Sequence, residues 1–170
     1  MLAITVGIAV AVAVDTYVVT MATVDSNSMA PALVAGERVV INRLDTVDRG
    51  DIVAFDGRGS FLPSVHPEVV YVKRVIGVGG DRVACCVNGQ LVLNGQPMDE
   101  PYLAPRTSED VSFDVIVPDG ALWVMGDNRP HSADSRAHLG DPGGGFVPLT
   151  RVEGTVTAVI WPLASARVVR

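Results

Sequence analysis

The segment that indicates the fold class is Val69-Val70-Tyr71-Val72-Lys73-Arg74-Val75-Ile76-Gly77-Val78, a long and mostly apolar stretch. Its many β-branched residues favour a β-strand. Successive side chains of a strand point to opposite faces, so Tyr71, Lys73 and Val75 share one face. Arg74 lies on the other face. The segment therefore predicts a β-protein that carries one lysine in a row of apolar side chains.

Strand and turn patterns continue along the chain on both sides of this segment. Asn88-Gly89 and Asn94-Gly95 are strong hairpin signals, and Pro118-Asp119-Gly120 marks another turn. Residues 56–68 and 140–150 are rich in Gly, Pro and Ser and predict loops. Further short strands are predicted at 38–42, 51–55, 83–87, 90–93, 111–117, 121–125 and 153–161.

The predicted fold is mainly β, with one compact antiparallel domain of short strands around one core. A length of 170 residues suits one such domain and a short appendage. A helix is expected only at residues 28–34 or in the N-terminal segment.

The N-terminal segment is strongly apolar and allows three interpretations. Residues 2–14 are apolar or small apart from Thr5, and Asp15 interrupts the run. A membrane span needs ~20 apolar residues, so the segment is a complete or clipped anchor, the core of a cleaved signal peptide, or a buried element of a soluble domain. No Lys or Arg precedes Arg38, so the C-terminal flank of an anchor is expected outside the cell. The expected division is an anchor at residues 1–20 and an extracytoplasmic β-rich domain at 21–170.

Composition and residue spacing argue against several classes of protein. The net charge is −6 and no Lys/Arg cluster occurs, which argues against a nucleic-acid partner. The three histidines form no HxxxH or HExxH pair, which argues against a zinc protease. Cys85 and Cys86 are the only cysteines, and they form no CxxC motif. Adjacent cysteines rarely bond to each other, so these two are expected to be small residues of a strand.

Lys73 is the only lysine beside twelve arginines. A lysine can lose its proton and act as a base, whereas an arginine effectively cannot. If the Tyr71 and Val75 face points inward, burial lowers the pKa of Lys73, and the neutral amine can accept a proton from a serine hydroxyl. The alternative is a lysine that extends to solvent from a strand edge, and spacing alone favours that alternative.

Two other segments are dense in small polar residues. Ser26-Asn27-Ser28-Met29-Ala30-Pro31-Ala32-Leu33 can hold a hydroxyl exposed at the end of a strand, although a serine in a turn is the commoner explanation. Residues 126–136 follow an apolar strand. There Asp134 and Arg136 are expected to point the same way on an extended backbone and form a salt bridge, while Ser132 can bond a neighbouring base. The alternative is a solvated loop.

Taken in order, these segments resemble the type I signal peptidase family. The family pattern Ser-Gly-Ser-Met-x-Pro-Thr-Leu matches residues 26–33 with two changes, and a second box stands here as Gly-Asp-Ile-Val-Ala-Phe at 50–55. The lysine box, Tyr-x-Lys-Arg-x-x-Gly-x-x-Gly-Asp, matches residues 71–81. The last box, Gly-Asp-Asn-x-x-x-Ser-x-Asp-Ser-Arg, matches residues 126–136 at every fixed position. The resemblance covers about residues 22–162, and four boxes in order are highly specific.

The resemblance implies a serine endopeptidase with a Ser–Lys dyad. Ser28 would attack the scissile carbonyl, and Lys73 would accept its proton. The Ser28 N–H and the Ser26 hydroxyl would form the oxyanion hole, and Ser132 would orient the lysine amine. The pair that would hold the loop is Asp134 and Arg136.

The resemblance also implies the substrate and its setting. Small apolar pockets would select Ala-x-Ala before the cleavage site, and their lining would be Met29, Leu33, Tyr71 and Val72. The substrates would be exported preproteins with signal peptides in the same lipid bilayer, cut by a single-pass protein of the cell membrane. The family needs no metal and no cofactor.

Three departures from the family pattern and two alternative functions remain. Asp25 stands in place of Pro, Asn27 in place of Gly, and Ala32 in place of Thr.

One alternative is a self-cleaving repressor of the SOS-response type, which would need a basic helix-turn-helix. The other is an inactive membrane-tethered β-domain that only binds partners, which would tolerate loss of the dyad.

Overall fold

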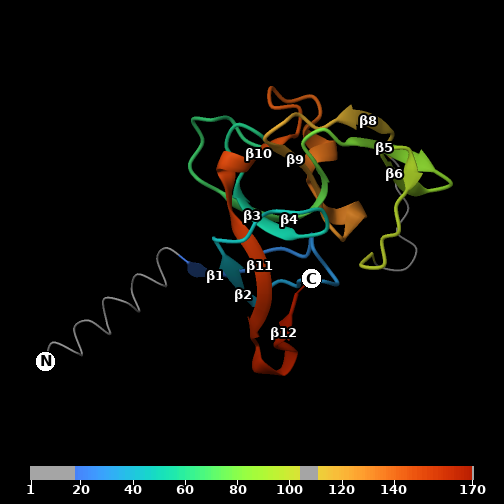
Figure 1. The fold of residues 1–170 in the computed structure, drawn as a ribbon. Coiled ribbons are helices and arrows are strands. Elements are labelled where there is room, and N and C mark those ends of the chain that lie inside the picture. The colour runs from blue at the N-terminus through green and yellow to red at the C-terminus, as the bar shows by residue number, and fades with distance from the viewer. Residues whose placement is uncertain (1–17, 104–110, 170) are drawn as a thin grey trace, which may run out of the picture.

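The computed structural model describes residues 18–103 and 111–169. They form two sheets in which every paired strand is antiparallel, so the predicted mainly antiparallel β fold is confirmed (Figure 1). The strands of the described residues are β1 (Val19–Thr23), β2 (Arg38–Asn42), β3 (Ile52–Asp56), β4 (Val70–Val78), β5 (Arg82–Val87), β6 (Gln90–Leu93), β7 (Gln96–Pro97), β8 (Phe113–Ile116), β9 (Ala121–Met125), β10 (Val147–Pro148), β11 (Val152–Trp161) and β12 (Arg167–Val168).

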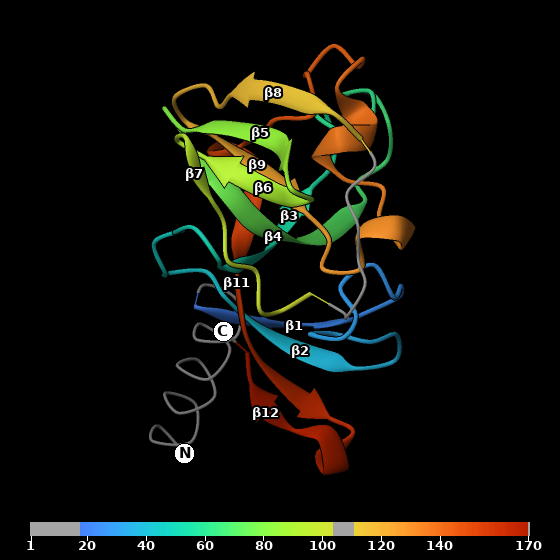
Figure 2. The same ribbon diagram turned by 90° about the vertical axis from the view of Figure 1, so that its right-hand side faces the viewer.

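The larger sheet has the order β1-β2-β11-β3-β4-β9-β10, with β12 paired to β11. The longest strand, β11, pairs with both β2 and β3, so it joins the two halves of the sheet (Figure 2). All five residues of β3 are buried, because Ile52 and Ala54 pack into one hydrophobic cluster while Val53 and Phe55 pack into another. The neighbouring strand β4 therefore rests on a support that is packed on both faces.

The smaller sheet has the order β7-β6-β5-β8. Its two turns fall on the predicted Asn-Gly pairs, and both residues of each pair have positive φ (Asn88 53°, Gly89 79°; Asn94 51°, Gly95 83°). Positive φ at both central residues is the geometry that Asn-Gly favours in two-residue hairpins.

Cys85 and Cys86 lie on β5 as expected, but they are joined by a disulfide, so the expectation that they do not bond to each other is wrong. The pairing of β5 with β6 shifts register between Cys85 and Val87. At such an irregularity neighbouring side chains no longer alternate strictly between the two faces.

Of the two places where a helix was expected, residues 28–34 instead form turns, with bonds such as Leu33 N–H to Met29 O (2.9 Å), and residues 1–17 of the N-terminal segment lie outside the described residues. Pro31 has no N–H to donate to a helix. The helical pieces of the described residues are short 3-10 turns: η1 (Arg129–His131), η2 (Ser135–His138), η3 (Leu149–Arg151) and η4 (Leu163–Ser165).

Residues 1–17 of the expected anchor lie outside the described residues, and Val19 and Thr20 already belong to β1. Within 18–103 and 111–169, no helix has the length and apolar character needed to cross a bilayer.

Candidate active site

Ser28 and Lys73 lie 45 positions apart in the sequence and meet in the structure. The Lys73 Nζ donates to Ser28 Oγ at 2.8 Å and to the Val72 carbonyl oxygen at 3.1 Å. Both side chains are buried, since Ser28 is 8% exposed and Lys73 is 4% exposed. A serine and a lysine at hydrogen-bond distance form a nucleophile and base pair if the amine is neutral.

Burial lowers the pKa of Lys73 from 10.5 to about 8, and the nearby Asp134 carboxylate opposes this shift. Lys73 lies 5.9 Å from the centroid of the Tyr71 ring, as expected for two residues on one strand face. The Lys73 side chain therefore faces the interior, and it does not extend to solvent from the strand edge.

The pair opens onto a groove of about 520 Å³ between the end of β1 and the start of β4. Met29, Tyr71 and Val72 line it, as the sequence predicts for the substrate pockets. Leu33 does not line it, because Leu33 is fully buried and packs in the hydrophobic cluster with Met29 and Val39. The groove is lined by Ala22, Thr23, Val24, Asp25, Ser26, Ser28, Met29, Glu68, Val69, Val70, Tyr71, Val72 and Lys73.

Both walls of the groove are strand edges. β1 is the outermost strand of its sheet, and β9 pairs with β4 only from Arg74 onward, so Val70–Lys73 has one edge without a partner strand in the described chain. Unpaired N–H and C=O groups of a strand edge can bond an added extended peptide. The groove therefore suits an extended chain that ends at Ser28.

The turn that carries Ser28 is tied down from several directions. Ser26 Oγ lies 3.2 Å from Ser28 Oγ, and the Ser28 carbonyl oxygen accepts from Asn128 N–H at 3.0 Å. The Asn27 side chain, at one of the departures from the family pattern, accepts from Ala35 N–H at 2.9 Å. Within the described part of the chain the Ser28 N–H makes no hydrogen bond, so this donor is available to a ligand.

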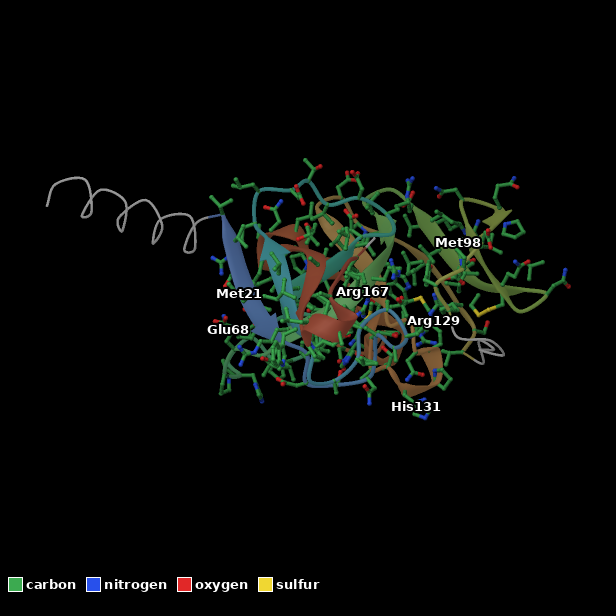
Figure 3. All side chains as sticks on the ribbon, turned by 90° about the horizontal axis from the view of Figure 1, so that it is seen from below. Met21, Glu68, Met98, Arg129, His131 and Arg167 are labelled. Atoms are coloured by element: carbon green, nitrogen blue, oxygen red, sulfur yellow. A yellow bond between two sulfur atoms is a disulfide. The ribbon has the colours of Figure 1, made fainter. Side chains whose placement is uncertain are left out.

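Arg167 is a clamp that the sequence patterns did not reveal (Figure 3). From β12 it donates to the Ala32 carbonyl oxygen at 2.5 Å and pairs with Glu37 at 2.7 Å. Glu37 in turn accepts from Val34 N–H at 3.0 Å. The backbone of the turn is thus held from the C-terminal end, including at Ala32, where the family usually has a hydroxyl.

Asp134 and Arg136 form the predicted salt bridge (2.8 Å), although Arg136 lies in the 3-10 turn η2 and not on an extended backbone. Asp134 is the N-cap of η2 and accepts from Arg136 N–H at 3.2 Å. Its other oxygen accepts from Gly126 N–H at 3.0 Å. The buried carboxylate therefore closes the loop of residues 126–134.

Ser132 does not bond Lys73. Its Oγ is buried and has no hydrogen-bond partner among the described residues. It lies against Gly126, where an added Cβ would stand 2.3 Å from Ser132 Oγ and 2.5 Å from the Ser28 carbonyl oxygen. Only glycine allows the loop to approach the Ser28 turn this closely.

The sequence patterns did not predict a buried ionic network that lies beside the loop of residues 126–134. Arg74 and Asp127 form a two-fold hydrogen-bonded pair (2.8 and 2.7 Å) with side chains 2% and 0% exposed. Glu100 pairs with Arg129, and the Tyr102 ring packs 4.1 Å from the Arg74 guanidinium carbon. One signal for this network was present in the sequence, because Arg74 and Asp127 each lie inside one of the four boxes. A charge that is buried in a strand or a loop needs a partner.

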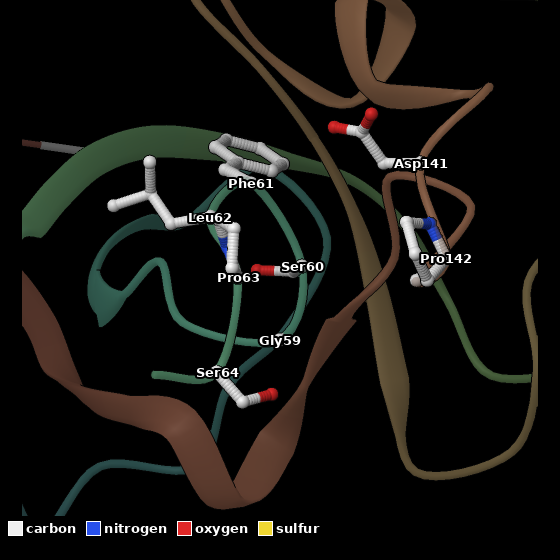
Figure 4. Close-up of a pocket in the computed structure, with 9 residues that line it drawn as sticks. Gly59, Ser60, Phe61, Leu62, Pro63, Ser64, Asp141 and Pro142 are labelled. Carbon is white, nitrogen blue, oxygen red and sulfur yellow. The ribbon is translucent and has the colours of Figure 1, made fainter. Parts of the chain in front are cut away.

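A second hollow, of about 430 Å³, lies between the loops around Ser60 and Pro142 (Figure 4). It shares no lining residue with the groove, so it is not part of the site around Ser28.

A mainly antiparallel β-domain that buries a hydrogen-bonded serine and lysine beside an edge-strand groove has the arrangement of a serine peptidase. Comparisons with known proteins define the class further. Residues 1–161 match the family model described as "Signal peptidase, peptidase S26". The chain is 37% identical to "Signal peptidase I S" of Bacillus subtilis (97% of this chain, 89% of the relative). It is 35% identical to "Probable signal peptidase I" of Mycobacterium leprae (86% of this chain, 70% of the relative).

A solved structure agrees with these relatives. The crystal structure of a signal peptidase I from Enterococcus faecalis is 30% identical with a TM-score of 0.50, and the match covers 66% of this chain and 98% of that chain. The chain belongs to the signal peptidase family, peptidase S26, and is a serine endopeptidase.

Proposed function

We propose that this chain removes signal peptides from exported preproteins by cutting after a small-x-small sequence, with Ser28 as the nucleophile and Lys73 as the general base. The observation that carries the proposal is the 2.8 Å contact between the Lys73 Nζ and Ser28 Oγ, both of which line the groove. The relatives named signal peptidase I support the substrate class.

The first half of the reaction uses the neutral lysine. Lys73 takes the proton of the Ser28 hydroxyl as Oγ attacks the scissile carbonyl carbon. Negative charge develops on the carbonyl oxygen, and the free Ser28 N–H and the Ser26 hydroxyl donate to it. Each such donor contributes about 3 kcal/mol when it is aimed at the developing charge.

In the second half, the Lys73 ammonium gives its proton to the leaving amine, and an ester links Ser28 to the signal peptide. A water molecule then attacks this ester with the same lysine as base, the bond between Ser28 Oγ and the acyl carbon breaks, and Lys73 returns the proton to Ser28 Oγ as the signal peptide leaves with a free carboxyl group. Ser132 is given no role in these steps, because its buried hydroxyl is unpaired within the described chain and does not bond the Lys73 amine that the family resemblance assigns it to orient.

The walls of the groove favour small side chains before the cut. Met29, Tyr71 and Val72 form an apolar lining beside the dyad. A peptide added to the strand edges points alternate side chains at this lining, which selects small residues at the first and third positions before the scissile bond.

The proposed location is the cell membrane, with an anchor that ends before Val19, where β1 begins, and with the β-rich domain outside the cytoplasm. A shared bilayer raises the effective concentration of the substrate at the groove. The apolar run of residues 2–14 supports an anchor in this segment.

The test is cleavage of a detergent-solubilised preprotein with an Ala-x-Ala site by the wild type, Ser28→Ala and Lys73→Arg. Lys73→Arg keeps the positive charge but removes an amine that can be neutral. Cleavage by the wild type and no cleavage by either folded variant supports the proposal. An inert wild type, or a fully active Lys73→Arg, contradicts it and favours the binding-domain alternative.

A further inference from the structure

The groove carries a carboxylate on each wall, and neither belongs to the dyad. Asp25 lies on the wall that leads to Ser28, and Glu68 lies on the wall that leads to Lys73. Both residues are exposed, with the Glu68 side chain 59% accessible. Figure 3 shows Glu68 next to β1, in agreement with its place in the groove lining.

The two carboxylates differ in whether a nearby cation offsets their negative charge. Glu68 has Arg58 as a partner at 3.2 Å. Asp25 makes no ion pair or hydrogen bond within the described part of the chain. The one cationic side chain in the groove lining is Lys73, which is neutral when it acts as the base. When Lys73 is neutral, the groove lining therefore carries two carboxylates and no cation, and Asp25 is the carboxylate without an ion-pair partner in the described chain.

We propose that Asp25 and Glu68 are specificity-determining residues that favour basic and disfavour acidic side chains in the part of the preprotein that occupies the groove. The inference rests on the proposed function, which places the residues before the scissile bond there. Asp25 is exposed at a position where the family usually has a neutral proline, so this selectivity is a property of this chain.

The strand geometry assigns the two carboxylates to different substrate positions. The side chains at the first and third positions before the cut face the apolar lining, so the side chain at the second position points away from it, and we assign this position to the exposed carboxylate of Asp25, three residues before Ser28. Glu68 is five residues before Lys73 along the groove wall. At ~3.3 Å per residue this brings it level with a residue about five positions before the cut.

The experiment measures kcat/KM for peptides that share one Ala-x-Ala site and differ only in x, which is Lys, Gln or Glu. The wild type is expected to prefer Lys over Glu by about fivefold or more at low salt, because attraction in one peptide and repulsion in the other act together. Raising the salt concentration should reduce this ratio, since exposed charges are screened. Asp25→Asn should reduce the ratio of kcat/KM for the Lys peptide to that for the Glu peptide by at least about threefold.

The matched control is Asp119→Asn, which removes one exposed carboxylate from the turn before β9, outside the groove. It should leave the Lys-to-Glu ratio unchanged. A second peptide series, with the charge five positions before the cut, should respond to Glu68→Gln in the same way and more weakly, because Arg58 already offsets Glu68.

The outcomes separate this inference from the proposed function. If the Gln peptide is not cut, or Ser28→Ala still cuts it, the proposed function fails. If the Gln peptide is cut by the wild type only, but the Lys-to-Glu ratio is near one or is the same in Asp25→Asn, the inference alone is overturned. A ratio that changes equally in Asp119→Asn also overturns it, because the effect would then come from net charge.

Discussion

Lys73 shows how burial prepares a single residue for chemistry. Its amine bonds one hydroxyl and one carbonyl oxygen, and neither partner carries a charge that would hold the proton. Desolvation therefore has the largest effect on the pKa of Lys73. The pKa falls to about 8, although the Asp134 carboxylate acts to raise it. A large fraction of the amine is then neutral at slightly alkaline pH.

This protonation predicts the pH dependence of cleavage. Only the neutral amine accepts the Ser28 proton, so kcat/KM for a small-x-small peptide should rise about tenfold per pH unit below the pKa of Lys73 and level off above about 8. Steady-state rates from pH 6 to 10, with folding checked at each pH, measure this. A flat profile between pH 6 and 9 would contradict it.

The same shift predicts that Lys73 lowers stability at neutral pH. Below its native pKa of about 8 the buried amine must be charged, and between 8 and 10.5 the unfolded chain binds a proton that the native state has released. The contribution of Lys73 to the free energy of unfolding of the wild type therefore rises as the pH increases from about 8 to 10.5.

Lys73→Met should accordingly raise the free energy of unfolding at pH 7 by about 3 kcal/mol, and the gain should vanish above about pH 10.5. Urea unfolding at pH 7 and pH 10.5 measures both values. A destabilised variant at pH 7 would show that the lost bond to Ser28 outweighs the desolvation of the ammonium.

At the scale of elements, the site depends on how closely the 126–136 loop approaches the Ser28 turn. Gly126 permits this approach, since a Cβ there would overlap Ser132 Oγ and the Ser28 carbonyl oxygen. Gly126→Ala should reduce kcat/KM by about 100-fold or more, because the nucleophile must move, and should cost about 1–3 kcal/mol of stability.

Gly140→Ala is the matched control for this prediction. It lies in the next loop, its φ is not positive, and an added Cβ would meet no atom within 4 Å. This variant should cleave the same peptide at the wild-type rate. Equal losses in the two variants, or no loss in Gly126→Ala, would contradict the close-contact explanation.

The segment before residue 104 supports the loop from behind through Glu100 and Arg129. Their side chains are 7% and 1% exposed, so Glu100→Gln removes one negative charge that pairs with the buried Arg129 guanidinium. The expected loss of stability is about 1.5–3 kcal/mol, the contribution of a buried hydrogen bond to a charged group.

The exposed pair Arg82 and Asp114 serves as the control, and Asp114→Asn should leave the melting temperature nearly unchanged. Calorimetry of both variants measures the difference. A melting temperature for Glu100→Gln within a degree or two of the wild type would show that the buried pair contributes little.

At the scale of the whole molecule, sequence patterns predicted features that are local. Alternation predicted the strand around Lys73 and the face of that lysine, and the Asn-Gly pairs predicted the hairpins of the smaller sheet. The boxes predicted that Ser28 and Lys73 belong to one site.

The contacts that complete the site were not predictable because they join distant segments. The strand order β2-β11-β3 depends on packing of both sheet faces, which no local pattern encodes. Arg167 reaches Ala32 from 135 residues away, and Arg129 reaches Glu100 across another loop. The disulfide between Cys85 and Cys86 depends on a register irregularity, and the free Ser132 hydroxyl depends on the exact fold of its loop.

The most direct test of the central claim is titration of Lys73 by NMR. It is the only lysine of the chain, so protein labelled with isotope in lysine alone gives one side-chain signal that needs no further assignment. The midpoint should lie near 8, where burial places the pKa, and should coincide with the midpoint of the cleavage profile. A midpoint near the ordinary 10.5 would mean that the amine is charged at working pH, and Lys73 would not be the base that activates Ser28.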